Sequence, residues 1–152
     1  MTPDDPEKVP GKHGLHVQIL WFDADLTELR VHASNNHFAG MADLYINHDE
    51  LAKLARAFRG FPASTKEQRD IELGNFNPNN GGGGLRLRLR CTDASGHVAV
   101  DVMLRTDPHH TGRSETAEFS VPVEPAAIDA FIAELDAMPL KVGATAYLRQ
   151  TA

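Results

Sequence analysis

Residues 85–105 alternate apolar and polar side chains with period 2 in two runs, and this pattern constrains the fold more than any other feature of the chain. Such alternation indicates strands with one buried face. A short loop at residues 93–96 separates the runs, so we predict an antiparallel β-hairpin in which Thr92 faces His97. A shift of one residue would expose the whole apolar set, which fixes the register. The apolar set is Leu85, Leu87, Leu89, Cys91, Val98, Val100, Val102 and Leu104.

The polar face of this hairpin presents a row of arginines, namely Arg86, Arg88, Arg90 and Arg105. Guanidinium groups bind phosphates and carboxylates through paired hydrogen bonds, so the row is a candidate binding face. The predicted register places Arg88 across from Asp101. Neighbouring strands, if paired in sequence order, bring further acids to this face: Asp70, Glu72 and Glu118. The alternative interpretation is therefore a structural lattice in which these acids neutralise the arginines.

The same alternation predicts five more strands, at residues 15–22, 28–33, 38–46, 70–73 and 117–123. In the first of them, Trp21 is expected to point into the core with Leu15, Val17 and Ile19. Pro122 indicates an edge position or a strand end for the last one. Residues 142–149 form either one more strand or an ordered arm.

Two amphipathic helices are predicted from apolar spacing and capping residues. Asn47 and Glu50 occupy the N-cap and N3 positions of a capping box, and Gly60 stands where a left-handed residue ends the first helix. Glu124 caps the second helix with Pro125 at its first position. The buried stripes are expected to be Leu51, Leu54, Ala55 and Phe58 in the first, and Ile128, Phe131, Ile132, Leu135 and Met138 in the second.

Together these elements predict an α+β fold, with a mostly antiparallel sheet of about six to eight strands and the two helices on one face. The apolar stripes and caps of the two helices coincide at a spacing of 77 residues, as with Asn47 and Glu124. The chain is thus either a duplicated three-strand-plus-helix unit or contains two helices that are alike by chance. Residues 1–14 are expected to be a flexible lead-in and residues 15–152 a single domain.

Composition excludes several classes of protein. Hydrophobic residues make up 41% and charged residues 24% of the 152, which is typical of a globular chain. A net charge of −6 argues against nucleic acid or anionic membrane as the partner. No apolar run is long enough to span a membrane, and the first residues do not resemble a secretion signal. The single cysteine, Cys91, agrees with a reducing compartment. We therefore expect a cytoplasmic protein.

No motif for a metal, a cofactor or a nucleophile stands out. Metal sites need three or four converging ligands, and the eight histidines show no such spacing. The glycine run at residues 81–84 lacks the lysine and hydroxyl residue of a phosphate-binding loop, so we interpret it as a flexible connection. Polar residues in two loops remain binding candidates: Asn77, Asn79, His109 and His110. No metal and no cofactor are expected.

Four stretches resemble a group of small uncharacterised bacterial proteins that includes the WapI-like immunity type, encoded near polymorphic-toxin genes. They are residues 38–40, 54–62, 71–74 and 85–105, and the resemblance extends over residues 15–138. It implies a non-enzymatic protein that neutralises a toxin partner, through the exposed sheet face or the loops at residues 75–84 and 107–113. One alternative is a small hydrolase or metal-dependent enzyme that uses His32, His37 or His109. Another is a homo-oligomer joined through a sheet edge or face.

Overall fold

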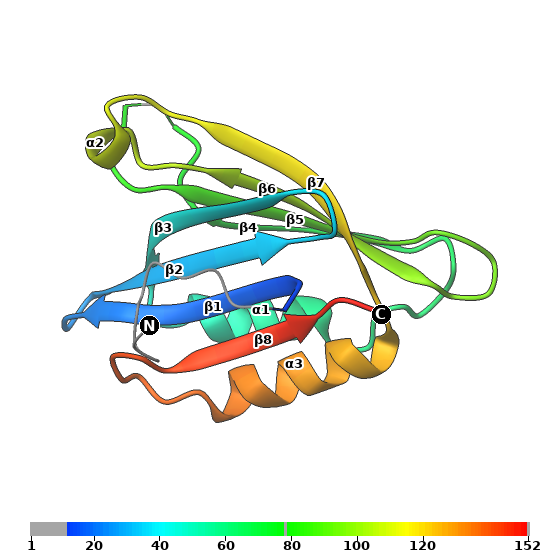
Figure 1. Ribbon diagram of the computed structural model, residues 1–152. Coiled ribbons are helices and arrows are strands. Elements are labelled where there is room, and N and C mark those ends of the chain that lie inside the picture. The colour runs from blue at the N-terminus through cyan, green and yellow to red at the C-terminus, as the bar shows by residue number, and fades with distance from the viewer. Residues whose placement is uncertain (1–11, 78, 152) are drawn as a thin grey trace.

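A computed structural model describes residues 12–77 and 79–151. Most of the expected lead-in at residues 1–14 lies outside this range, and Gly14 already belongs to the first strand. Figure 1 shows the elements in chain order, which are β1 (Gly14–Phe22), β2 (Leu26–Ser34), β3 (Ala39–Asn47), α1 (Glu50–Phe58), β4 (Gln68–Gly74), β5 (Gly84–Cys91), β6 (Val98–Arg105), α2 (Pro108–Thr111), β7 (Thr116–Val123), α3 (Pro125–Ala137) and β8 (Thr145–Arg149). The segment left open at residues 142–149 thus contains a strand, and α2 was not predicted.

The strands form two four-stranded sheets, with strand orders β3-β2-β1-β8 and β4-β5-β6-β7. All pairings are antiparallel, as predicted, but the expectation of one sheet was wrong. The physical reason is coverage, because two short helices cannot bury the apolar face of a single sheet this wide. The apolar side chains of both sheets instead share one core with the helices. Helix α3 lies along β8, α1 lies beside β4, and the two helices contact each other.

Each half of the chain has the element order strand, strand, strand, helix, strand, apart from the short α2. The last strand of each half pairs in the sheet of the other half, since β4 pairs with β5 and β8 pairs with β1. The first residues of β3 and β7, Ala39 and Thr116, are 77 residues apart, as are Gln68 and Thr145, which begin β4 and β8. The spacing noticed in the helices therefore extends to the strands on both sides of them.

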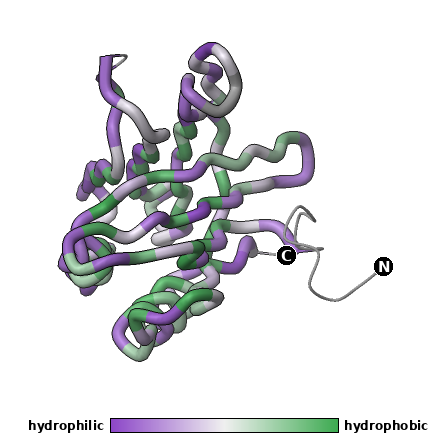
Figure 2. The backbone as a smooth tube through the Cα atoms, turned by 90° about the vertical axis from the view of Figure 1, so that its left-hand side faces the viewer, coloured by the Kyte–Doolittle hydropathy of each residue, from purple (hydrophilic) through white to green (hydrophobic). Residues whose placement is uncertain are grey.

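The central hairpin has the predicted register, from Leu85 opposite Leu104 to Cys91 opposite Val98. The Thr92 N–H donates to the His97 carbonyl at 2.8 Å and closes the loop. Hydrophobic and hydrophilic residues alternate along the strands in Figure 2. Leu87, on the inner face of β5, is buried. Alternation alone therefore identified the core side of this sheet.

Of the three helix ends for which capping signals were predicted, two agree with the structure. Helix α1 begins at Glu50 with Asp49 as its N-cap, so the N-cap predicted at Asn47 was wrong. Half of the capping box is nevertheless present, because the Asn47 N–H donates to the Glu50 carboxylate. Gly60 has the left-handed φ of 73° that a helix end requires. Glu124 and Pro125 begin α3 as predicted.

Trp21 does not point into the core, and this expectation was wrong. The pairing of β1 with β2 slips between Ile19 and Trp21, so Leu20 is an extra residue in β1. Such a β-bulge reverses the alternation for the residues that follow it. Trp21 consequently lies across from Glu28 on the outer face of the sheet and is 46% exposed.

Candidate functional site

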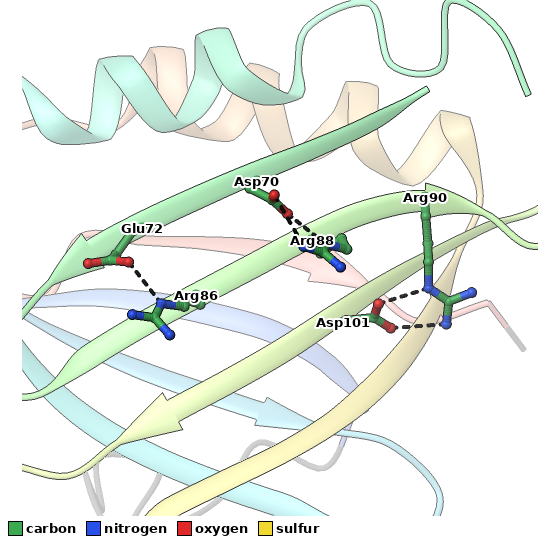
Figure 3. A network of polar contacts seen from close by, with 6 residues as sticks. All are labelled: Asp70, Glu72, Arg86, Arg88, Arg90 and Asp101. Atoms are coloured by element: carbon green, nitrogen blue, oxygen red, sulfur yellow. Dashed lines mark hydrogen bonds and ion pairs between the residues drawn. The ribbon is translucent and has the colours of Figure 1, made fainter. Parts of the chain in front are cut away.

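The outer face of the β4-β5-β6-β7 sheet carries ion pairs between arginines of β5 and acids of the neighbouring strands (Figure 3). The Arg86 Nε donates to Glu72 at 2.8 Å. Arg88 makes two hydrogen bonds to Asp70, at 2.7 and 3.3 Å. The hydrogen bonds from Arg88 lower the pKa of the Asp70 carboxyl below its ordinary value. Both pairs are exposed, and exposed pairs contribute about 0–1 kcal/mol each.

Arg90 reaches an acid that is not directly across from it. Ala99 is its partner in register, so Arg90 turns to Asp101, which lies across from Arg88, and binds it at 2.8 and 3.0 Å. The Ser120 hydroxyl donates to the same carboxylate. Burial raises the pKa of Asp101, but the hydrogen bonds from Arg90 and Ser120 outweigh burial and leave that pKa below its ordinary value. Acids from both sides thus neutralise the arginines of β5.

A shallow hollow of about 520 Å³ lies on this face. Its charged lining consists of Asp70, Glu72, Asp101, Glu118, Arg86 and Arg88. Both arginines are already bound to carboxylates, so an anionic ligand would have to displace Asp70 or Glu72. The hollow is consequently a poor phosphate site, even though its ion pairs hold the charged side chains in fixed positions.

Arg105 belongs to the same polar face by register, but it is only 5% exposed and lies outside the row. Its Nη1 donates to the Asn75 carbonyl at 2.7 Å and to the Gly82 carbonyl at 3.4 Å. Its Nε donates to the Ser114 hydroxyl at 2.8 Å. The expectation that Arg105 is presented for binding was therefore wrong, because the loop between β4 and β5, which we call the glycine-rich loop, folds over it. Arg105 holds that loop against the loop after β6.

The glycine-rich loop is bonded to the sheets rather than being a loose connection. The Gly83 N–H donates to the Asp43 carbonyl at 2.9 Å, and the Asn75 N–H donates to the Gly83 carbonyl at 2.9 Å. A Cβ atom at Gly83 would lie 2.5 Å from the Arg105 carbonyl oxygen and 2.8 Å from that of Asp43. Glycine is needed here because two backbones approach closely, so the loop serves packing and not flexibility.

The structure brings the two candidate binding loops together. An added Cβ at Gly81 would meet the His109 ring at 3.2 Å, and His109 itself is exposed at the start of α2. The Asn77 side chain accepts from the Asn79 N–H at 3.0 Å and shapes the loop. The side chain of His110 lies outside the part that is described. These loops are thus adjacent to each other, at the end of the sheet that Arg105 occupies.

The histidines of the enzyme alternative lie on different elements. His32 is on β2, His37 is in the turn before β3, and His109 is in α2. Among the side chains that the structure describes, which leave out that of His110, no group of three His, Cys, Asp or Glu is arranged to hold a metal ion.

An exposed apolar surface, which sequence reasoning missed, lies on the outer face of the β3-β2-β1-β8 sheet. Trp21 of β1, Glu28 of β2 and Tyr45 of β3 form one cross-strand row. We call the exposed apolar side chains of this region the Trp21 face, which comprises Trp21 (46% exposed), Leu26 (38%) and Tyr45 (40%). Aromatic residues are enriched in protein interfaces. Sequence reasoning missed this surface because alternation places Trp21 in the core, and only the bulge at Leu20 turns that side chain outward.

Elsewhere on the same outer face, two histidines are held neutral. His16 lies across from His32 on one side and from Tyr147 on the other, and the His16 and Tyr147 rings stack at 3.8 Å. Burial lowers the pKa of His16 to about 4 and also lowers that of His32. The charges of Arg149 and Lys12 lower the His16 pKa further, while a bond to the Lys12 carbonyl opposes them.

These surfaces are the candidate sites that the described residues offer. None of the described helices has the length and apolar character needed to cross a bilayer. Comparison of the chain with family models, with curated proteins and with solved structures found no match.

Proposed function

We propose that this chain is a non-enzymatic protein-binding module and that the Trp21 face is its contact surface. The observation that carries the proposal is the row of Trp21, Glu28 and Tyr45, in which two large aromatic side chains are turned to solvent on a rigid sheet. Large aromatic side chains exposed on one face of a folded domain are typical of interaction sites, and Trp and Tyr dominate the energy of such contacts. The backbone holds these side chains in place before binding, which reduces the entropy lost on association.

The outer face of the β4-β5-β6-β7 sheet, with its arginine ion pairs, has only a secondary role in the proposed interface. Its guanidinium groups are engaged with Asp70, Glu72 and Asp101, so a partner gains little by replacing contacts that exist already. Exchanging one ion pair for another changes the free energy of binding little, whereas covering exposed aromatic surface contributes about 25 cal/mol per Å². We therefore place the centre of the interface on the Trp21 face.

The resemblance to immunity proteins gives this module a role. We propose that it acts in the cytoplasm and neutralises a toxin by covering the surface that the toxin needs. An acidic inhibitor suits this task, because its net charge of −6 accelerates encounter with a basic partner.

We also propose that the fold arose by duplication of a unit of three strands, a helix and a further strand. The exchanged positions of β4 and β8, together with the recurring spacing of 77 residues, support this origin.

Photo-crosslinking in the source cells tests the proposed function. A benzophenone amino acid is placed at Tyr45, with matched positions at Arg88 on the other sheet and at exposed Glu134 on α3. We expect one discrete crosslinked protein from Tyr45 and none from Glu134. Crosslinks of equal yield at all three positions, or none at Tyr45 in protein that is folded, would contradict the proposal.

A further inference from the structure

Acidic residues lie within and beside the Trp21 face. Glu28 stands within the aromatic row, between Trp21 and Tyr45. Asp23 and Asp25 occupy the exposed turn that directly follows β1. Asp23 uses one carboxylate oxygen to accept the N–H groups of Asp25 and Leu26, both at 2.8 Å. Within the described residues, none of these three acids forms a salt bridge with a basic side chain. Negative charge therefore accompanies the exposed aromatic surface.

The Tyr45 hydroxyl lies next to Glu28, the acid at the centre of this surface. Burial is the largest cause that raises the pKa of Tyr45. Glu28 raises it next, both through its charge and through the hydrogen bond that its carboxylate accepts from the hydroxyl, and the charges of Asp107 and Asp43 add to this. The Glu28 carboxylate is therefore held beside the aromatic row by Tyr45.

We propose that the Trp21 face receives an arginine or lysine side chain from a basic segment of the partner protein. A cation placed over the Trp21 ring is attracted by the ring electrons, and Trp is the best of the aromatic residues for this contact. The Glu28 carboxylate next to that ring accepts a charge-assisted hydrogen bond from the same cation. Tyr45 and Leu26 then cover the aliphatic stem of the side chain. This inference rests on the proposed function and names the chemistry of the partner.

Charge also distinguishes this partner from a second copy of the chain. In a symmetric dimer the same patch meets itself, so Glu28, Asp23 and Asp25 of one copy would approach those of the other. Juxtaposed like charges disfavour association. A basic partner converts the same acids into favourable contacts.

The single tryptophan of the chain gives a direct readout at this surface. The full chain is titrated with an oligoarginine peptide, with an oligoglutamate peptide of equal length as the control, while Trp21 fluorescence is recorded. We expect a saturable change with oligoarginine only. Glu28→Gln should weaken the apparent affinity by about fivefold or more. Glu134→Gln, which removes the same charge from an exposed position on α3, should weaken it by less than about twofold.

Equal weakening by the two variants would show that oligoarginine is held by net charge alone and would overturn the inference. Unchanged Trp21 emission would overturn it as well, as would light scattering that shows a dimer of this chain which Trp21→Ala dissociates. Because the titration uses a synthetic peptide, its failure leaves the crosslinking result at Tyr45 intact. A crosslinked partner without oligoarginine binding would thus refute the cationic contact while keeping the proposed function.

Discussion

Lowering the pH should destabilise this fold by protonating His16, at pH values where the carboxylates of the protein are still ionised. The imidazole stacks on Tyr147, and its Nε2 is buried with no hydrogen-bond partner in the described structure. Burial lowers the pKa of His16 from 6.5 to about 4, so the unfolded chain binds the proton more readily than the folded one. The stability linked to His16 is fully present above about pH 6.5 and is lost as the pH falls toward about 4.

The size of the effect follows from these two pKa values. Between about pH 7 and about pH 5, the free energy of unfolding should fall by about 2 kcal/mol on account of His16 alone. His32, across from it on β2, has a lowered pKa and adds a loss of the same sign. Urea denaturation at both pH values measures this directly, since 2 kcal/mol corresponds to a midpoint shift of about 1 M for a small protein.

His16→Phe is the decisive variant, because it keeps a ring against Tyr147 and removes the titrating group. Its loss of stability between about pH 7 and about pH 5 should be smaller than that of the natural chain by about 2 kcal/mol. His37→Phe in the exposed turn before β3 is the matched control and should leave most of the pH dependence in place. An equal pH dependence in His16→Phe and the natural chain would refute the assignment.

Three further predictions concern the described packing. Arg105→Met leaves the carbonyls of Asn75 and Gly82 without their donor, so it should lower the free energy of unfolding by about 2 kcal/mol or more and speed amide exchange in residues 75–83; unchanged exchange there would count against this role. Gly83→Ala brings a Cβ atom within 2.5 Å of a backbone oxygen and should be destabilising by about 2 kcal/mol or more in thermal melts, whereas Gly81→Ala meets only the His109 ring and should cost much less. Leu87→Ala should cost about 2–5 kcal/mol and Arg88→Ala under about 1 kcal/mol by urea denaturation, and similar costs for the two would contradict the division into core and exposed lattice.

Local features of the sequence predicted local structure well. The hairpin register follows from side-chain alternation, and Gly60, Glu124 and Pro125 mark helix ends through their own backbone preferences. The presence of Asp70 and Glu72 on the face of the arginines also followed, because β4 pairs with β5, its neighbour in the sequence. Each of these depends on residues that are near each other in the sequence or joined by one short connection.

Non-local features were not predictable in the same way. The division into two sheets depends on β8 pairing with β1, two strands from opposite ends of the described chain. The exposure of Trp21 depends on one extra residue in β1, which alternation alone places in the core. By alternation, Arg105 belongs to the exposed side of β6, and its burial depends on contacts with Asn75, Gly82 and Ser114 from two loops outside the strands. The pairing of β8 and the burial of Arg105 are decided by contacts between distant segments, whereas the bulge at Leu20 lies in a local hairpin but is not marked by side-chain alternation.

The strands β4 and β8 each pair in the sheet formed by the other half of the chain, so neither half of this protein can complete a sheet alone. During synthesis on the ribosome, β1, β2 and β3 emerge long before the strand that covers their open edge, so the first sheet waits with an unpaired edge until β8 has been made. Cleavage between the halves should likewise leave two fragments that each lack a border strand and can regain it only from the other. We therefore expect the two sheets to melt in one transition.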